Sequence, residues 1–264
     1  MTILNNKIAV LVGAGAVENA WEPILTIFKQ MSDSETDADS ANFLIAKSIC
    51  ALRLYSKLPT GEKQLKEEQE TVKLLKEIIG DSLKLAQQKG ILKPRKEFET
   101  ILNRFVFDNP NNLFGFVSTN WDTVIDAEAR RLVNQKYSYI EEVKVFHIHG
   151  SIEEHQHLYL PTETSQEHYR TDEENEKLGL DHYNTLQFLS AANRIILYGI
   201  SLDPLDAELN LLLNGAFTKG KSINEVIIIN PDYNKIRKRV KLLLYPRKDV
   251  IIRCYHPVNL DLEC

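Results

Sequence analysis

The sequence has few cysteines and no long apolar run. Its three cysteines, Cys50, Cys254 and Cys264, are far apart and form no C-x-x-C pair. This spacing predicts neither a disulfide framework nor a structural zinc site, so we expect a reducing, cytoplasmic setting. No apolar stretch approaches the roughly 18 residues of a membrane span, and the first residues lack the apolar core of a signal peptide. We therefore expect no membrane association.

An excess of positive charge is also absent. The net charge is -5 over 264 residues, which argues against a surface that holds nucleic acid directly. The length is sufficient for one large domain, or for a domain that carries a substantial insertion. A small molecule, or a partner that already holds the nucleic acid, is the expected kind of ligand.

Apolar runs rich in β-branched residues alternate with segments of helical periodicity. Buried strands that alternate with helices predict an α/β fold, a Rossmann-like doubly wound parallel sheet. Strands are predicted at 7–12, 113–118, 144–149, 194–198, 225–229 and 250–253, with a short one at 158–160. Helices of the sheet layers are predicted at 20–28, 123–134, 180–193, 206–217 and 233–243.

The segment from about 31 to 112 has a different character. A polar, acidic loop at 32–40 precedes a helical pattern that continues to Tyr55, and Leu58-Pro59-Thr60-Gly61 breaks it. A long charged helix at 62–89 and a third at 97–107 follow. We interpret the charge runs as solvated helix faces. The prediction is a single domain, 1–264, with a helical insertion at about 31–112.

Unusual polar residues follow the predicted strands. Because the carboxyl ends of parallel strands meet at one edge of a sheet, these tips are expected to line one crevice. They are Gly13-Ala14-Gly15, Thr119-Asn120-Trp121-Asp122, His149-Gly150-Ser151, Gly199-Ile200-Ser201 and Asn230.

Each tip also has a simpler interpretation. A strand, a glycine turn and a helix form a phosphate site, but Gly13 and Gly15 fit a plain tight turn equally well, and Glu18 in place of a third glycine would repel an anion. Asn120 and Asp122 are typical helix N-caps. His147 and His149, two residues apart on a strand, are expected on one face, where His149 would exchange a proton or bind a metal.

The order of the motifs resembles the sirtuin family, and more closely the sirtuin-like NAD hydrolase domains of bacterial antiphage defence systems. The family pattern is G-A-G-x-S, T-N-x-D, H-G, G-x-S and a later Asn. Here it corresponds to Gly13-Ala14-Gly15-Ala16-Val17, Thr119-Asn120-Trp121-Asp122, His149-Gly150, Gly199-Ile200-Ser201 and Asn230. The resemblance implies an NAD-binding domain in which the motifs at Gly13-Ala14-Gly15 and Thr119 contact the dinucleotide.

Individual roles follow from the same resemblance. Gly13 and Gly15 would approach the NAD pyrophosphate, and Asn120 would lie by the nicotinamide ribose and orient the attacking water. Asp122 would hold the carboxamide, and His149 would be the base at the ribose hydroxyls. The phosphate and adenosine side would be lined by Gly199 and Ser201, with Asn230 at the adenine ribose.

Two departures from the family pattern matter. Val17 replaces the family serine and Glu18 follows it, so the phosphate end must differ. The zinc ribbon of sirtuin deacylases is absent, because no cysteine lies between Cys50 and Cys254. We therefore expect no zinc and no acyl-lysine groove. NAD is expected as the substrate, water as the acceptor, and nicotinamide and ADP-ribose as the products.

Three other functions remain open. A non-catalytic sensor of NAD or ADP-ribose would keep the fold without turnover. A metal-dependent hydrolase would use His147 with His149, and His155 with His157. A dehydrogenase is disfavoured, because the acidic ribose-binding residue expected about 20 positions after the glycines would fall in a loop and not after a second strand.

The resemblance also implies control. Unrestrained hydrolysis would deplete the cell of NAD, so NAD depletion in antiphage defence requires oligomerisation or a regulatory sensor protein such as a short Argonaute or a ring-forming ATPase. The helical insertion is the candidate surface for that contact.

Overall fold

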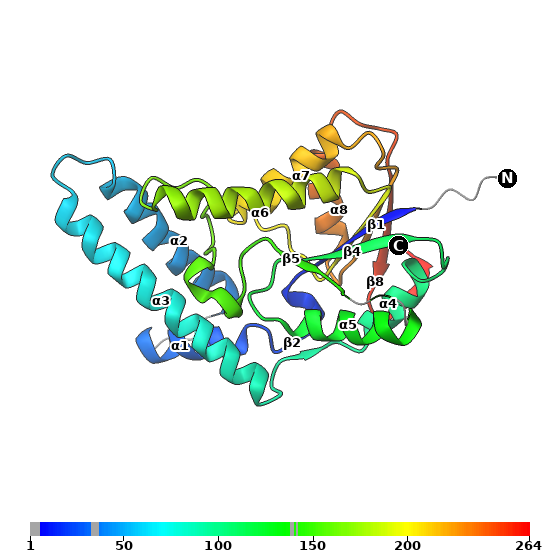
Figure 1. Cartoon of the computed structure of the whole chain (residues 1–264), viewed down its shortest axis with the longest axis horizontal. Helices are drawn as coiled ribbons and strands as arrows, with labels where there is room; N and C mark the ends of the chain where they lie inside the picture. The colour runs from blue at the N-terminus through cyan, green and yellow to red at the C-terminus, as the bar shows by residue number, and fades with distance from the viewer. Residues whose placement is uncertain (1–5, 33–36, 138–139, 141) are drawn as a thin grey trace.

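A seven-stranded sheet lies at the centre of the computed structural model (Figure 1). The structure describes residues 6–32, 37–137, 140 and 142–264. The sheet order is β5-β4-β1-β6-β7-β8-β9. Its strands are β1 (Lys7–Val12), β4 (Leu113–Ser118), β5 (Val145–His147), β6 (Arg194–Tyr198), β7 (Glu225–Ile229), β8 (Ile251–His256) and β9 (Asn259–Glu263).

All neighbouring strands of this sheet are parallel except β8 and β9. Numbered by themselves, the parallel strands follow the order 3-2-1-4-5-6, which is the Rossmann order. The predicted fold class, a Rossmann-like α/β fold, is therefore confirmed.

Helices cover both faces of the sheet. Alternate residues of β1 enter different cores: Ile8, Val10 and Val12 pack on one side, Ala9 and Leu11 on the other. The first core is shared with α1 (Glu22–Ser32), α2 (Ala38–Tyr55), α3 (Glu62–Gln88), α4 (Glu97–Phe105) and α5 (Val124–Lys136). The second is shared with α6 (Asp172–Ser190), α7 (Ala207–Lys219) and α8 (Tyr233–Leu243).

The predicted insertion is joined to the sheet by a common core. Ile45 and Ile49 of α2 and Ile79 of α3 belong to the same buried cluster as Val10 of β1. Figure 1 shows α2 and α3 extending beyond one end of the sheet, with α6 running back from them to α7. A two-stranded antiparallel ribbon of β2 (Val17–Glu18) and β3 (Lys93–Pro94) ties the end of the insertion to the segment after β1.

Several predicted boundaries are wrong. No strand forms at 158–160: the Tyr159 N–H donates to the His149 carbonyl and the Leu160 N–H to a Glu163 carboxylate oxygen, not to a neighbouring strand. Helix α6 begins at Asp172 and not near 180, because Thr171 forms a capping box with Glu174.

Other boundaries shift by a few residues. Helix α2 begins within the predicted loop at 32–40, where the Asp37 side chain accepts from the Ser40 N–H; residues 33–36 of that loop lie outside the described part. Strand β5 ends at His147, and β9 was not predicted. In the described ranges, no helix is both long enough and apolar enough to cross a membrane.

Candidate active site at the switch point of the sheet

A cavity of about 770 Å³ opens where the strand order reverses, beside the carboxyl ends of β1 and β6. This is the place where open α/β sheets bind ligands, and the volume lies in the usual range of about 300 to 1,000 Å³ for ligand sites. Every residue predicted for the site lines this cavity: Gly13, Ala14, Gly15, Thr119, Asn120, Asp122, His149, Gly199, Ser201 and Asn230.

The glycine turn after β1 is closed by hydrogen bonds within the fold. The Gly13 N–H donates to the Tyr198 carbonyl and the Gly15 N–H to the Gly199 carbonyl, both at 2.9 Å. The Ala16 N–H donates back to Gly13, also at 2.9 Å. These amides are therefore not free to bind a phosphate. The expected helix also does not follow directly, since the 3-10 turn η1 (Ala14–Ala16) and β2 come before α1.

Close contact between two turns explains these glycines. A Cβ on Gly13 would lie 2.6 Å from the Gly199 carbonyl oxygen. Gly199 has φ +65°, and its Cβ would lie 2.5 Å from the backbone of Gly15 and Ala16. Only glycine allows both the left-handed conformation and this approach. The turns after β1 and β6 are thus locked together at the floor of the site.

The departures at Val17 and Glu18 also have a structural explanation. Val17 is 1% exposed, belongs to the core and pairs with Pro94 across the β2–β3 ribbon. Glu18 is exposed and does not line the cavity. The carboxylate of Glu18 is therefore not placed to repel an anionic ligand.

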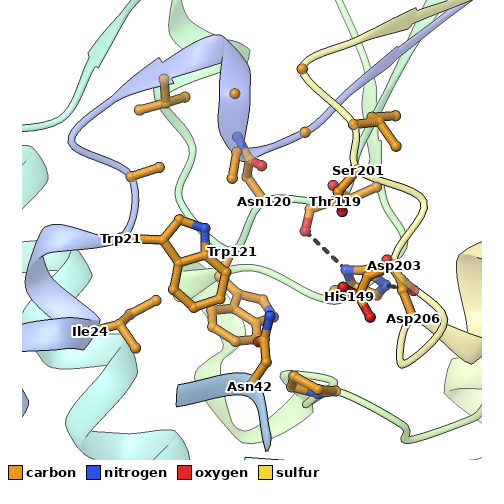
Figure 2. A pocket seen from close by; sticks show the side chains of 18 of the residues that line it. Trp21, Ile24, Asn42, Thr119, Asn120, Trp121, His149, Ser201, Asp203 and Asp206 are labelled. Atoms are coloured by element: carbon orange, nitrogen blue, oxygen red, sulfur yellow. Dashed lines mark hydrogen bonds and ion pairs between the residues drawn. The ribbon is translucent and has the colours of Figure 1, made fainter. Parts of the chain in front are cut away.

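Asn120 places an unpaired donor in the cavity wall (Figure 2). The residue is 6% exposed, and its backbone N–H donates to the Ser118 hydroxyl at 3.1 Å. Among the described residues its side-chain Nδ2 has no hydrogen-bond partner. A buried amide donor without a partner is costly, so a ligand or water oxygen is the expected acceptor.

Asp122 combines a helix cap with a place in the site. Its Oδ1 accepts the Val124 N–H at 3.1 Å at the start of α5, as the capping interpretation predicted. The side chain is 3% exposed. Burial raises the pKa of Asp122 to about 6, although the Val124 N–H and the nearby His147 favour the carboxylate. The group is therefore poised between its two protonation states near neutral pH.

His149 is held between a carbonyl and a carboxylate. Its Nδ1 lies 2.9 Å from the Thr119 carbonyl oxygen, and its Nε2 lies 2.9 Å from Asp206 Oδ1. Burial lowers the pKa of His149, but the charge and hydrogen bond of Asp206 outweigh burial, so the net shift is upward. Both nitrogens face acceptors, an arrangement that favours the protonated ring. A base would need Nε2 released from Asp206.

Sequence reasoning missed Asp206. It is the N-cap of α7, and its Oδ1 accepts the Leu209 N–H at 3.1 Å in addition to its contact with His149. An aspartate before a predicted helix signals a cap and nothing more. Its proximity to His149 is a tertiary contact that no local pattern reveals.

His147 serves a different helix. Its Nδ1 lies 3.1 Å from the Asn120 carbonyl oxygen and its Nε2 3.0 Å from Asp126 of α5. Because β5 ends at His147, the period-two pattern does not extend to His149. Among the described residues no cluster of three His, Cys, Asp or Glu side chains is arranged to hold a metal. The side chains of His155 and His157 lie outside that set.

The adenosine side predicted at Asn230 is occupied by turn contacts. The Asn230 Nδ2 donates to the Ile200 carbonyl at 2.9 Å, and its Oδ1 accepts the Asp232 N–H at 2.8 Å. Asn230 therefore ties the turns after β6 and β7 together at the cavity edge. Arg239 of α8 further fixes this turn by donating to the Ser201 carbonyl at 2.8 Å.

The opposite wall comes from residues that the motifs did not identify. Figure 2 shows Trp21, Trp121 and Asn42 on the side of the cavity away from Ser201 and Asp206. Trp121 lies inside the T-N-x-D motif, and its Nε1 donates to the Tyr159 carbonyl at 2.9 Å. Ile24 of α1, Leu83 of α3 and Arg95 after β3 also line the cavity.

A scan against protein-family models finds no family that matches this chain, and a search of the curated proteins finds no matching relative. The relationship to sirtuin-like NAD hydrolases therefore stays a prediction from the motifs.

Proposed function

We propose that this chain hydrolyses NAD at the bond between nicotinamide and ribose, giving nicotinamide and ADP-ribose. The observation that carries the proposal is the buried, unpaired Nδ2 of Asn120 in the same cavity as Asp122 and His149. These residues come from two motifs, T-N-x-D and H-G, and the cavity lies at the switch point where dinucleotides bind in this fold.

The chemistry suits these groups. The C–N bond breaks with its electron pair passing to the nicotinamide nitrogen, so the leaving group departs neutral and needs no acid. An oxocarbenium ion develops on the ribose, water adds to it, and one proton is released. The protein has to position the ring and the water and to stabilise the cation. Asn120 Nδ2 would orient the water, and the Asp122 carboxylate would accept the carboxamide N–H.

His149 would act at the ribose hydroxyls. Its Nδ1 is anchored on the Thr119 carbonyl, which leaves Nε2 as the nitrogen that meets the substrate. In the unliganded protein Asp206 occupies Nε2. Substrate binding would replace that contact with a ribose hydroxyl. Nε2 would first pass its proton to Asp206 or to solvent, and the neutral imidazole could then accept the hydroxyl proton.

The test is nicotinamide release, measured by chromatography after purified protein is incubated with NAD. Asn120→Ala and His149→Ala are each expected to reduce release at least about 100-fold. The matched controls are Asn134→Ala and His168→Ala, since both residues are exposed and neither lines the cavity. Release that survives both site substitutions would overturn the assignment.

A sensor of NAD or ADP-ribose is the second candidate. It is favoured by the two acceptors around His149, which leave the ring no free lone pair in the unliganded protein. Titration with NAD separates the two functions. A sensor would bind NAD and release no nicotinamide, even when it is assembled into its oligomer or joined to its partner protein.

Control by oligomerisation or by a sensor protein, such as a short Argonaute or a ring ATPase, is part of the proposal. The helical insertion exposes large apolar side chains, including Phe43 and Leu54 of α2, at 66% and 56% exposure. Phe43→Ser with Leu54→Ser would leave the core intact and test this surface. An unchanged oligomeric state and an unchanged NAD depletion response in cells would remove the insertion from the control mechanism.

A further inference from the structure

We propose that Arg95, within the helical insertion between β3 and α4, supplies the positive charge that binds the diphosphate of the dinucleotide. This inference rests on the proposed function, because it assigns a phosphate contact within the same cavity. It moves phosphate recognition from the backbone of the glycine turn to a side chain that follows β3.

The glycine turn creates the need for such a group. The N–H groups of Gly13, Gly15 and Ala16 all donate to carbonyls within the fold, and the Val17 N–H donates to Ala14. A helix N-terminus does not replace them, since α1 starts only at Glu22 and carries that acid in its first turn. These four N–H groups offer no donor to a diphosphate beside the turn, so a cationic side chain is the expected contact.

Arg95 is held directly against the glycine turn. Its backbone N–H donates to the Ala16 carbonyl at 2.9 Å, and its Nε donates to the Gly15 carbonyl at 3.0 Å. The β2–β3 ribbon fixes the residues just before it, with Glu18 opposite Lys93 and Val17 opposite Pro94.

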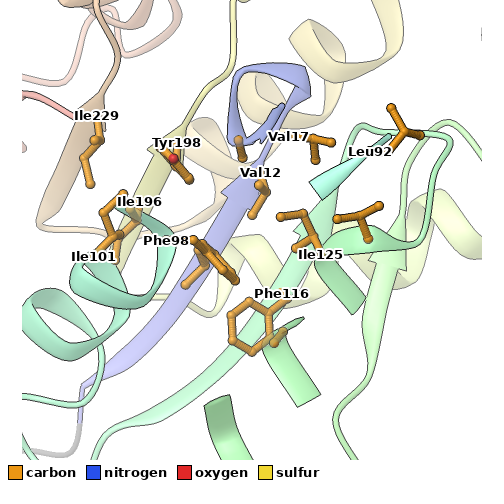
Figure 3. Packing of buried hydrophobic residues seen from close by; sticks show 14 of the residues in the cluster. Val12, Val17, Leu92, Phe98, Ile101, Phe116, Ile125, Ile196, Tyr198 and Ile229 are labelled. Carbon is orange, nitrogen blue, oxygen red and sulfur yellow. The ribbon is translucent and has the colours of Figure 1, made fainter. Parts of the chain in front are cut away.

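Buried apolar side chains anchor this ribbon. Val17 and Leu92 are 1% and 3% exposed and belong to the core cluster (Figure 3). The backbone on both sides of the contact is thus fixed before a ligand enters. The position of the Arg95 backbone and Nε is therefore set by the fold.

The free end of Arg95 suits a diphosphate. The residue is exposed, lines the cavity, and among the described residues no carboxylate pairs with its guanidinium. With Nε fixed on Gly15, the remaining guanidinium N–H groups are available for bidentate contact with phosphate oxygens.

Lys29 and Lys235 also line the cavity, from α1 and α8. Both are exposed, and among the described residues neither has a hydrogen bond to the glycine turn. A flexible ammonium loses more side-chain entropy on binding than a guanidinium that is already partly fixed. Arg95 is therefore the cation that the fold has prepared for this place.

The experiment is a calorimetric titration with ADP-ribose and, separately, with adenosine, which lacks phosphate. Arg95→Gln is expected to weaken ADP-ribose binding about 10- to 100-fold and to leave adenosine binding unchanged. Arg95→Lys, which keeps the charge without the Nε bond, is expected to lose less. The control is Lys96→Gln: this neighbouring residue is exposed and does not line the cavity.

The outcomes separate this inference from the hydrolase proposal, because the titration requires no turnover. Arg95-dependent ADP-ribose binding without nicotinamide release, also under the conditions used to activate the protein, would support the inference and favour the sensor over the hydrolase. If the protein releases nicotinamide and the ADP-ribose affinity of Arg95→Gln stays within twofold of the wild type, the inference about Arg95 is wrong and the hydrolase proposal stands. An equal loss in Lys96→Gln would also overturn the phosphate contact. So would an equally large loss of adenosine binding in an Arg95→Gln variant whose thermal profile shows that it is folded.

Discussion

The two walls of the cavity are built in different ways. The sheet-edge wall consists of the turns after β1, β4, β5, β6 and β7, whose positions follow from the register of parallel strands. The insertion wall consists of side chains between Trp21 and Arg95, which reach the cavity through helix packing and the β2–β3 ribbon. The first wall supplies Asn120 and His149, and the second supplies Asn42 and Arg95. Proposed chemistry and proposed substrate binding thus come from different parts of the fold.

Ion pairs to two buried carboxylates, Glu163 and Glu167, join the insertion to the segment before α6. Arg53 of α2 donates to Glu167 at 2.9 Å through Nε, and Lys76 of α3 lies 3.0 Å from Glu163. Glu163 also lies 2.7 Å from Arg170. Both carboxylates belong to the segment between η2 (Ile152–His157) and α6, and Glu163 lines the cavity. This segment is the structural link between the insertion and the site.

The largest expected effect is at this link. Glu163→Gln is predicted to destabilise the protein by about 3 to 5 kcal/mol, because it leaves Lys76 and Arg170 buried without a counter-charge. Burial alone would raise the pKa of Glu163, but Lys76 and Arg170 hold it below its usual range, so the wild-type group is ionised. Urea denaturation measures the change.

The matched control for that change is Glu128→Gln. Glu128 pairs with Arg131 at 2.6 Å on a partly exposed helix face, so its loss is expected to cost less than about 1 kcal/mol. Equal losses in the free energy of unfolding for Glu163→Gln and Glu128→Gln would show that the Glu163 ion pairs do not hold the insertion to the site.

A smaller effect compares Gly199 of the sheet-edge wall with Gly90 of the insertion. Gly199 and Gly90 have nearly the same φ, +65° and +66°, but a Cβ on Gly90 would meet only Lys93 Cε at 3.9 Å. Gly90→Ala is predicted to cost about 1 kcal/mol from backbone strain alone. Gly199→Ala adds steric overlap with the turn after β1 and is predicted to cost about 3 kcal/mol. Thermal unfolding of both variants measures the difference, and equal losses would mean that the two turns can separate.

The same contrast explains what the sequence revealed. The sheet-edge wall was predictable, because strand periodicity marks each buried strand and the polar residues that follow, such as Asn120 and His149, identify themselves by interrupting it. Parallel order then brings them to one edge. The role of the glycines was not predictable: a closed turn and an open phosphate cradle require the same residues at Gly13 and Gly15.

The insertion wall was not predictable beyond its helices. The apolar stripe of α3 correctly indicated Ile79 and Leu83 as core residues, because helical periodicity is local information. Arg95 reaches Gly15, 80 positions away, and Asp206 reaches His149, 57 positions away. Such contacts depend on how the elements pack, and an isolated arginine or aspartate in the sequence carries no mark of them.

A pH-dependent effect separates a carboxylate of the sheet-edge wall, Asp122, from one elsewhere in the insertion, Asp37. Burial raises the pKa of Asp122 from 3.8 to about 6, so the folded state holds a proton that the unfolded state has lost, and stability falls as pH rises through that window. Above it the cost is about 3 kcal/mol, from roughly two pKa units. Asp122→Asn keeps an acceptor for Val124 and is predicted to be more stable than the wild type by up to that amount at pH 8, with the advantage gone near pH 4.

Asp37, in the insertion, is expected to behave in the opposite way. Hydrogen bonds from Ser40 lower the pKa of Asp37, so its contribution to stability is present above the unfolded pKa and is lost as pH falls through the folded value. Asp37→Ala is therefore predicted to destabilise at pH 8 and to have little effect at low pH. Urea denaturation at pH 8 and near pH 4 measures the free energy of unfolding of Asp122→Asn and Asp37→Ala. A change of the same sign in both variants at pH 8 would contradict the two pKa directions.

The smallest expected effect tests the insertion wall itself. Asn42 of α2 lines the cavity opposite Asp206 (Figure 2). We expect Asn42 to contact a part of the substrate that is unchanged by the reaction. Asn42→Ala would then remove one neutral hydrogen bond, which predicts a KM about fivefold higher and an unchanged kcat. Gln64→Ala on the exposed face of α3 is the control. A fall in kcat comparable to that expected for Asn120→Ala would place chemistry on both walls, and the division between reacting and binding surfaces would then be wrong.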